Sequence, residues 1–136
     1  MHEKKRKGDL AVAQVIARLA ELGWVVGIPL TEHAPYDLFA EKDGVIHTVQ
    51  VRYTSPTKAS IKTKLVSTWA DRHGVHRRPR RKGQFSLLAI YAPGAGIFFI
   101  TDAELGENCR EVCLRLSPTG NCQKKGVRMA RSFLSF

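Results

Sequence analysis

An Asp-Gly dipeptide between two apolar-rich segments is the sequence feature that most constrains how this chain folds. Asp43-Gly44 separates Tyr36–Ala40 from Val45–Tyr53, and an Asp-Gly pair in that setting is typical of a two-residue β-hairpin turn. A two-residue turn also sets the register of the strands, because Lys42 must then face Val45. The sequence therefore predicts one hairpin of defined register in the first half of the chain.

Three polar side chains meet on one face of this predicted hairpin. The register places Asp37 opposite Gln50, and directly opposed residues have Cβ atoms about 5 Å apart. Arg52 follows Gln50 by two residues, so it points to the same face of the strand. A slip of one residue would separate the three, because it would move one set of side chains to the other face.

Apolar periodicity predicts the other elements. A helix is expected over Gly8–Leu22, where apolar residues recur at helical spacing, and a short strand follows at Trp24–Ile28. Phe85–Tyr91 and Ile97–Ile100 are nearly continuous apolar runs, as expected for central strands. Three more elements are expected: a short helix over Ala103–Gly106 capped by Asp102, a strand over Glu111–Leu116 and a helix over Gln123–Leu134. A mixed central sheet flanked by helices accommodates this order, so the predicted fold class is α/β.

Length and charge narrow the class of protein. The chain has 136 residues, which suits one domain over 1–136, and 43% of them are apolar, enough for a folded core. The longest apolar stretch, 85–100, contains a proline and two glycines, so no membrane span is expected. No apolar signal region follows the basic N-terminus, so a cytoplasmic protein is expected. The net charge of +10 favours a polyanionic partner, first nucleic acid and second an acidic membrane surface.

Three basic runs carry much of this charge: Lys4–Lys7, Arg72–Lys82 and Lys124–Arg131. Cations that neutralise several phosphates give strong, salt-dependent affinity for nucleic acid. Residues 54–84 are predicted to form an exposed basic insertion or mobile loop, which is the best candidate for contacts to base edges in a groove. The candidate DNA-binding residues are Lys4, Lys5, Arg6, Lys7, Lys62, Lys64, Arg72, Arg77, Arg78, Arg80, Arg81 and Lys82.

The cysteines are interpreted as structural. Cys109, Cys113 and Cys122 are an odd number, and an intracellular chain normally keeps its cysteines reduced. They could join His73 and His76 as zinc ligands, but the spacings His-x2-His and Cys-x3-Cys match no compact zinc finger. The favoured interpretation is small apolar residues in or near a strand.

An aspartate on one strand beside a polar-x-cation pair on the next suits the hydrolysis of phosphodiester bonds. That reaction needs a divalent metal, an activated water and a cation near the scissile phosphate, and carboxylate oxygens are good ligands for Mg²⁺. Asp37, Gln50 and Arg52 are therefore the candidate catalytic residues, with the Asp37 carboxylate as a candidate metal ligand.

At these residues the chain resembles the PD-(D/E)XK nuclease superfamily, whose motif stands here as Pro35-Tyr36-Asp37 and Gln50-Val51-Arg52. It is most similar to the small homing endonucleases encoded in group I introns. Blocks over nearly the whole chain carry this resemblance, in the same order: KGDLAVA (7–13), PLTEHAPYDLFA (29–40), VQVRY (49–53), WADRHGVH (69–76), LAIYAP (88–93) and LRLSPTGNCQKKGVRMA (114–130). The resemblance implies a restriction-endonuclease-like fold, a Mg²⁺-dependent DNA double-strand break, with Mn²⁺ as the alternative metal, and a tetramer. The small size of the chain favours a symmetric homo-oligomer, a dimer or a tetramer.

Three positions depart from the usual superfamily pattern. Gln50 stands where most members have Glu or Asp, although the homing branch resembles this chain in using Gln. Arg52 stands where Lys is expected, and because Arg stays protonated it cannot act as a general base, although it can grip a phosphate. Val12 stands where many members carry a helix Glu, and Asp9 is the nearest substitute, so the resemblance implies Asp37, Gln50 and Asp9 as candidate metal ligands. Asp9 has an alternative interpretation, as a helix N-terminal charge favoured by the helix dipole.

Other functions stay open at this point. A Holliday junction resolvase of the same superfamily shares the core fold, the small size and the basic surface. Arg52 and Val12 also suit a non-catalytic DNA-binding protein with a decayed nuclease site. An RNA-binding structural protein is supported by charge alone.

Overall fold

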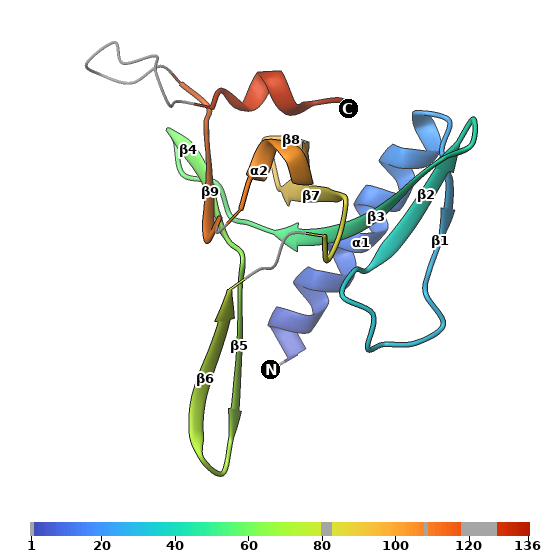
Figure 1. The fold of residues 1–136 in the computed structure, drawn as a ribbon. Helices are drawn as coiled ribbons and strands as arrows, with labels where there is room; N and C mark the ends of the chain where they lie inside the picture. The colour runs from blue at the N-terminus through green and yellow to red at the C-terminus, as the bar shows by residue number, and fades with distance from the viewer. Residues whose placement is uncertain (1, 80–82, 108, 118–127) are drawn as a thin grey trace.

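A five-stranded mixed sheet forms the centre of the computed structural model, which describes residues 2–79, 83–107, 109–117 and 128–136 (Figure 1). The strands, in their order across the sheet, are β1 (Val25–Gly27), β2 (Leu38–Lys42), β3 (Val45–Tyr53), β7 (Leu87–Ala92) and β8 (Gly96–Thr101). Strands β3 and β7 are parallel, and the other neighbours are antiparallel. The predicted α/β class with a mixed sheet is confirmed. Within the described residues, no helix combines the length and apolar character needed to cross a membrane.

The β2–β3 hairpin has the register that its turn predicts. Lys42 pairs with Val45, and the ladder continues to Leu38 opposite Val49. The turn residues Asp43 and Gly44 have φ angles of 51° and 81°, the left-handed conformations that this kind of two-residue turn requires. Strand β2 begins at Leu38, two residues later than Tyr36, where the sequence predicted its start.

Helix α1 (His2–Glu21) covers one face of the sheet. Its buried residues are Ala11, Val15 and Leu19, which lie four residues apart along one side of the helix. The helix starts at His2 instead of the predicted Gly8, because the basic N-terminal residues are good helix formers. Glu3 adds an ion pair to Arg6 in the first turns, with N···O 2.9 Å.

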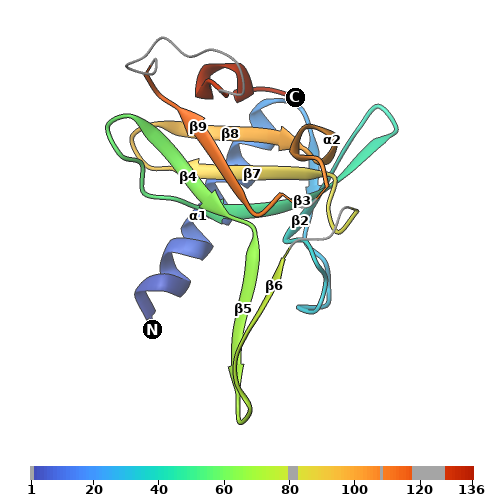
Figure 2. The same cartoon turned by 60° about the vertical axis from the view of Figure 1, so that its left-hand side comes forward.

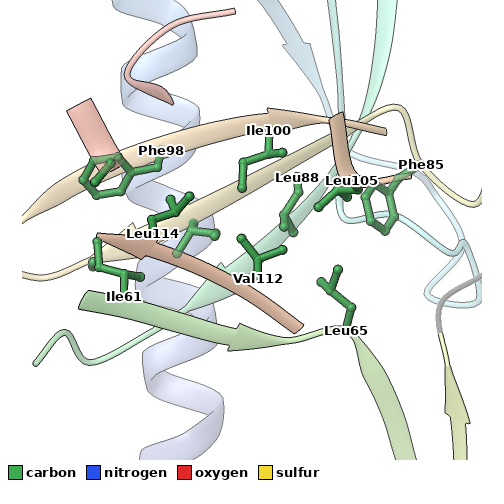
Figure 3. Packing of buried hydrophobic residues seen from close by; sticks show 12 residues of the cluster. Ile61, Leu65, Phe85, Leu88, Phe98, Ile100, Leu105, Val112 and Leu114 are labelled. Atoms are coloured by element: carbon green, nitrogen blue, oxygen red, sulfur yellow. The ribbon is translucent and has the colours of Figure 1, made fainter. Parts of the chain in front are cut away.

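A two-stranded ribbon covers the opposite face. It pairs β4 (Ser60–Lys64) with β9 (Glu111–Arg115), and Figure 2 shows it crossing β7 and β8 on the side away from α1. Figure 3 shows the core between the ribbon and the sheet, with Ile61 and Leu114 toward one end of the cluster and Leu88 and Leu105 toward the other. The predicted flanking by helices is therefore right for one face. On the other face the ribbon does most of the covering, helped by the short helices α2 (Asp102–Leu105) and η1 (Ala130–Phe133).

This sandwich explains why β7 is apolar along its length. Leu87 and Ala89 belong to the core under α1, whereas Leu88 and Ile90 belong to the core under the β4–β9 ribbon. A strand that is covered on both faces needs apolar residues at consecutive positions instead of alternate ones. The prediction of Phe85–Tyr91 as a central strand is confirmed, with the strand beginning at Leu87.

The segment 54–84 is more ordered than the sequence predicted. It holds β4 and a hairpin of β5 (Val66–Asp71) and β6 (Gly74–Pro79), which projects from the body of the protein (Figures 1 and 2). Of the two predicted alternatives, the mobile loop was wrong, because the segment forms three strands, whereas the projecting β5–β6 hairpin agrees with an exposed basic insertion. The local pattern around β4 is that of a half-buried strand, since Ile61 and Thr63 are buried and Lys62 and Lys64 are exposed.

Two smaller predictions near the C-terminus also need correction. Thr101, not Asp102, is the N-cap of α2, because its Oγ1 accepts from Glu104 N at 3.2 Å while its own N donates to the Glu104 carboxylate at 3.0 Å. Residues 123–127 of the helix predicted over Gln123–Leu134 lie outside the described residues. In the described part, Met129 forms a β-bridge with Arg115 and Ala130–Phe133 form the 3₁₀ helix η1, so the prediction of an α-helix there was wrong.

Two cysteines lie where the sequence placed them. Cys113 is in β9, and Cys109 is in the loop that leads into it. Cys122 is outside the described residues.

Phe136 packs in a cluster of aromatic rings. The Phe136 ring stacks on Trp24 with 5.1 Å between centroids, and it contacts the rings of Phe99 and His47 at 4.8 and 5.5 Å. His47 Nδ1 is 3.0 Å from Ser86 Oγ. Burial lowers the pKa of His47 below its ordinary value, because it disfavours the charged imidazolium.

The His47 pKa predicts a pH dependence of stability. Because the folded state binds a proton at His47 less readily than the unfolded chain, the free energy of unfolding is expected to fall as the pH drops below about 6.5. Urea unfolding between pH 7.5 and 5.5 measures this. His47→Gln is expected to reduce the dependence, whereas His33→Gln, at an exposed loop histidine, is expected to keep it. An unchanged pH dependence in His47→Gln would contradict the assignment.

Candidate active site

Asp37 is held by β3 at the end of the hairpin away from the turn. Its backbone N donates to Val49 O at 2.9 Å, and its Oδ2 accepts from Val51 N at 2.9 Å. The carboxylate thus takes the place of a backbone acceptor where the β2–β3 ladder ends. Its second oxygen, Oδ1, accepts no hydrogen bond from the described residues, so it remains able to bind another group.

Asp37, Gln50 and Arg52 line one cavity of about 260 Å³. Gln50 and Arg52 alternate along β3 with Val49 and Val51, which belong to the core under α1. The polar pair therefore points to the opposite face of the sheet, and the structure brings together the three side chains that the hairpin register predicted. The remaining lining residues are Ala34, Pro35, Leu65, Gln84 and Phe85.

Arg52 brings a desolvated positive charge to this pocket. Its Nε is buried and has no hydrogen-bond partner in the described part of the chain. Burial lowers the pKa of Arg52, because it disfavours the charged guanidinium, and the nearby Asp37 carboxylate acts in the opposite direction. The ordinary pKa of an arginine is so high that the group stays charged at neutral pH.

The donor set suits a hard divalent cation that is held weakly. Asp37 offers a carboxylate and Gln50 an amide oxygen, both of them ligand types for Mg²⁺. In the described ranges, no group of three or more His, Cys, Asp or Glu side chains could hold a metal ion. A Mg²⁺ ion here would need water, backbone carbonyl or phosphate oxygens to complete its coordination.

Asp9 is not brought to the pocket. It is exposed on α1, which packs on the face of the sheet opposite to Gln50 and Arg52. Val12, at the position where a helix carboxylate was considered, packs against the core under α1. The candidate ligand Asp9 is therefore a surface charge on the helix. Because α1 begins at His2, Asp9 lies about two turns into the helix, beyond the first turn in which the helix dipole favours a carboxylate, so that alternative interpretation is not supported either.

The predicted DNA-binding residues lie on three separate elements. Lys4, Lys5 and Arg6 are exposed on α1, while Lys7 is half-buried with its Nζ 5.7 Å from the centre of the Tyr53 ring. Lys62 and Lys64 point outward from β4. Arg72 is exposed in the turn between β5 and β6, Arg77 and Arg78 lie in β6, and Arg80, Arg81 and Lys82 fall outside the described residues.

Sequence reasoning missed the pocket wall made by Leu65 and Gln84–Phe85. Leu65 directly precedes β5, and Gln84 follows β6 after a short segment. The two ends of the β5–β6 hairpin therefore lie close to the pocket. No local pattern points to these residues, because they line the same pocket as Asp37 only once the ribbon has folded over the sheet. Phe85 was predicted only as the start of a strand.

Comparison with protein families matches residues 2–136 to the PD-(D/E)XK endonucleases. The chain belongs to the PD-(D/E)XK endonuclease family. Among solved structures, it is similar to the bacterial homing endonuclease I-Ssp6803I, with 25% sequence identity and a TM-score of 0.72. The similarity covers 95% of this chain and 86% of that one. Comparison with curated proteins gives no match.

Family membership confirms the resemblance that the ordered sequence blocks indicated, and with it the restriction-endonuclease-like fold. The residues that the sequence predicted as the family motif, Asp37, Gln50 and Arg52, are among those that line the pocket. They offer one carboxylate, one amide and one guanidinium, where the superfamily pattern has two carboxylates and a lysine.

The Asp37 hydrogen bond predicts how the hairpin responds to substitution. Asp37→Ala leaves Val51 N without its acceptor, and we expect it to lower the free energy of unfolding by about 1–2 kcal/mol. Asp37→Asn keeps an oxygen for that bond and is expected to be the more stable of the two. Urea denaturation compares them. Equal losses would show that the charge of Asp37, not its hydrogen bond, stabilises the hairpin.

Proposed function

We propose that this protein is a metal-dependent DNA endonuclease that hydrolyses phosphodiester bonds, most like a homing endonuclease. The observation that carries the proposal is the convergence of Asp37, Gln50 and Arg52 on one cavity in a chain of the PD-(D/E)XK endonuclease family. The solved structure to which it is similar is described as a bacterial homing endonuclease, which favours DNA as the substrate.

The pocket residues have complementary roles in this proposal. Asp37 and Gln50 would hold Mg²⁺, or Mn²⁺ as the alternative, and the metal when bound would supply positive charge and an activated water. Arg52 cannot accept a proton, so its part is to bind phosphate oxygens and stabilise their developing negative charge. The bond between Asp37 Oδ2 and Val51 N keeps the carboxylate in place, so that no reorganisation is needed when substrate arrives.

The basic elements supply a surface for the DNA backbone. Lys62 and Lys64 on β4 belong to the ribbon that covers the pocket face of the sheet. The β5–β6 hairpin extends from the pocket rim, and a two-stranded ribbon is of a size that the major groove admits. A chain of this size covers a short length of duplex, so we infer a homo-oligomer, either a dimer or a tetramer.

Cleavage of DNA with defined substitutions tests the proposed function. The wild-type protein is expected to cut DNA with Mg²⁺ or Mn²⁺ and not with EDTA. Asp37→Asn is expected to reduce the cleavage rate at least about 100-fold, because it removes the carboxylate ligand. Asp9→Asn, on the far face of the sheet, is expected to cleave at the wild-type rate.

The choice of DNA substrate separates the alternatives. Long duplexes and synthetic four-way junctions are offered to the same protein. Cleavage of junctions alone would identify a Holliday junction resolvase that acts on branched DNA. DNA binding without cleavage of either substrate, with Mg²⁺ or with Mn²⁺, would identify a non-catalytic DNA-binding protein.

Salt dependence tests the β4 surface. The double variant Lys62→Gln with Lys64→Gln is expected to weaken duplex binding and to reduce the slope of log affinity against log salt by about 2. Fluorescence anisotropy at several salt concentrations gives this slope. The control Arg18→Gln removes a cation that is paired with Glu21 on α1, with N···O 3.4 Å, and it is expected to leave the slope unchanged. Identical slopes in the double variant and the wild type would contradict contact through β4.

A further inference from the structure

The loop that joins β1 to β2, residues 28–37, exposes two large apolar side chains. Leu30 has a relative exposure of 106%, the highest among the large apolar residues that the structure describes, and Ile28 has one of 66%. Single exposed apolar residues are common on protein surfaces, but two of them so close together in one loop indicate a place where a partner binds. Contact with water is unfavourable for a leucine, so covering Leu30 would favour binding.

Both ends of this loop are fixed to the sheet beside the pocket. At the first end the Phe39 ring lies over Gly27, so closely that a Cβ at that glycine would stand 2.2 Å from the ring. At the other end Pro35 lines the cavity of the motif residues. Pro35 follows Leu30 by five residues, a span of at most about 18 Å. Leu30 therefore lies within about five base-pair steps of a phosphate bound in the pocket.

The loop is also stiffened on either side of Leu30. Pro29 fixes the backbone φ angle directly before it. Directly after it, Thr31 Oγ1 accepts from His33 N at 3.2 Å. A side chain that a preordered loop presents loses less conformational entropy when it binds, so Leu30 is well placed to enter a partner.

The loop extends to the same side of the molecule as two basic elements. Figures 1 and 2 show that the loop, the β5–β6 hairpin and the start of α1 all point away from the turn of the β2–β3 hairpin. Lys4, Lys5 and Arg6 are exposed on that part of α1, and Arg72 is exposed in the turn of the β5–β6 hairpin. A polyanion attracted by these cations would approach the side on which the loop stands.

The residue types of the loop suit bases better than phosphates. Residues 28–37 contain no lysine or arginine, and the Glu32 carboxylate would repel a phosphate. Leucine, isoleucine and proline are instead among the residues that proteins insert between stacked base pairs. Insertion would bury Leu30 against the faces of the bases, which requires no positive charge in the loop.

We propose that Leu30 is an apolar wedge that inserts between two base pairs of bound DNA and kinks the duplex beside the pocket. Bending at the unstacked step brings more of the DNA backbone against the basic elements on the same side of the protein. The inference rests on the proposed function for DNA as the partner, but its test measures binding in EDTA and needs no cleavage.

A duplex with one abasic site tests the wedge, because the missing base removes part of the cost of unstacking. The protein can shift along the duplex, so the abasic site does not have to lie in a known target sequence. In competition followed by fluorescence anisotropy in EDTA, the wild type is expected to bind the abasic duplex about fivefold or more tighter than the intact one. Leu30→Ala is expected to bind both equally, and Leu30→Met, which keeps a long apolar side chain, is expected to restore the preference.

Val45→Ala is the matched control. Val45 is an exposed aliphatic residue with a relative exposure of 52%, but it lies at the turn of the β2–β3 hairpin, on the side away from the loop. This variant is expected to keep the preference of the wild type for the abasic duplex. Loss of the preference in Val45→Ala as well as in Leu30→Ala would contradict a specific role of Leu30.

Three further outcomes would overturn the wedge: no preference for the abasic duplex in the wild type, an unchanged preference in Leu30→Ala, or a smaller assembly of Leu30→Ala in light scattering. The last result would place Leu30 in a contact between copies of the chain. Cleavage of DNA without the abasic preference would refute the wedge and leave the proposed function intact. The preference without cleavage, by contrast, would support the wedge and refute the proposed endonuclease.

Discussion

The pocket depends on the register of one β-hairpin. The left-handed residues of the Asp43-Gly44 turn hold β2 against β3 so that the polar residues at the far end share a face. The Asp37 carboxylate then accepts a hydrogen bond from Val51 N at the point where the backbone ladder stops. A register slip of one residue would move Gln50 and Arg52 to the face covered by α1, where Val49 and Val51 now fill the core. The chemistry of the site is thus set by a turn six residues away from Asp37.

The two layers that enclose the sheet differ in what they contribute to the site. Helix α1 fills one face with apolar contacts and brings no carboxylate to the motif, because Val12 packs in the core and Asp9 faces solvent. The β4–β9 ribbon covers the other face and continues into Leu65, which walls the pocket. The packing on this face therefore also forms one wall of the pocket that Arg52 lines.

Features that depend on short-range chemistry were predictable from the sequence, and those that depend on distant pairing were not. The Asp-Gly turn gives the register of Asp37 and Gln50, and consecutive apolar residues show that β7 is covered on both faces. In the pairing of β4 with β9, Lys64 lies opposite Glu111. Nothing local in either strand identifies its partner. The charge of segment 54–84 concealed strand β4 for the same reason, since its buried residue Ile61 packs against Leu88 and Ile90 of a strand that comes later in the chain.

The difference between arginine and lysine changes what such a pocket can do. A lysine beside a metal can lose its proton and so relieve the repulsion between two cations, whereas the Arg52 guanidinium keeps its charge. Asp37 is the one carboxylate among the described residues that line the pocket, so a divalent cation there would need further oxygen ligands. Cations exceed carboxylates in the whole chain by 22 to 12, so the chain itself offers few other acidic groups for that purpose. Under the proposed function, oxygens of the DNA phosphates would supply the remaining negative charge, and Arg52 would bind those phosphates without giving up a proton.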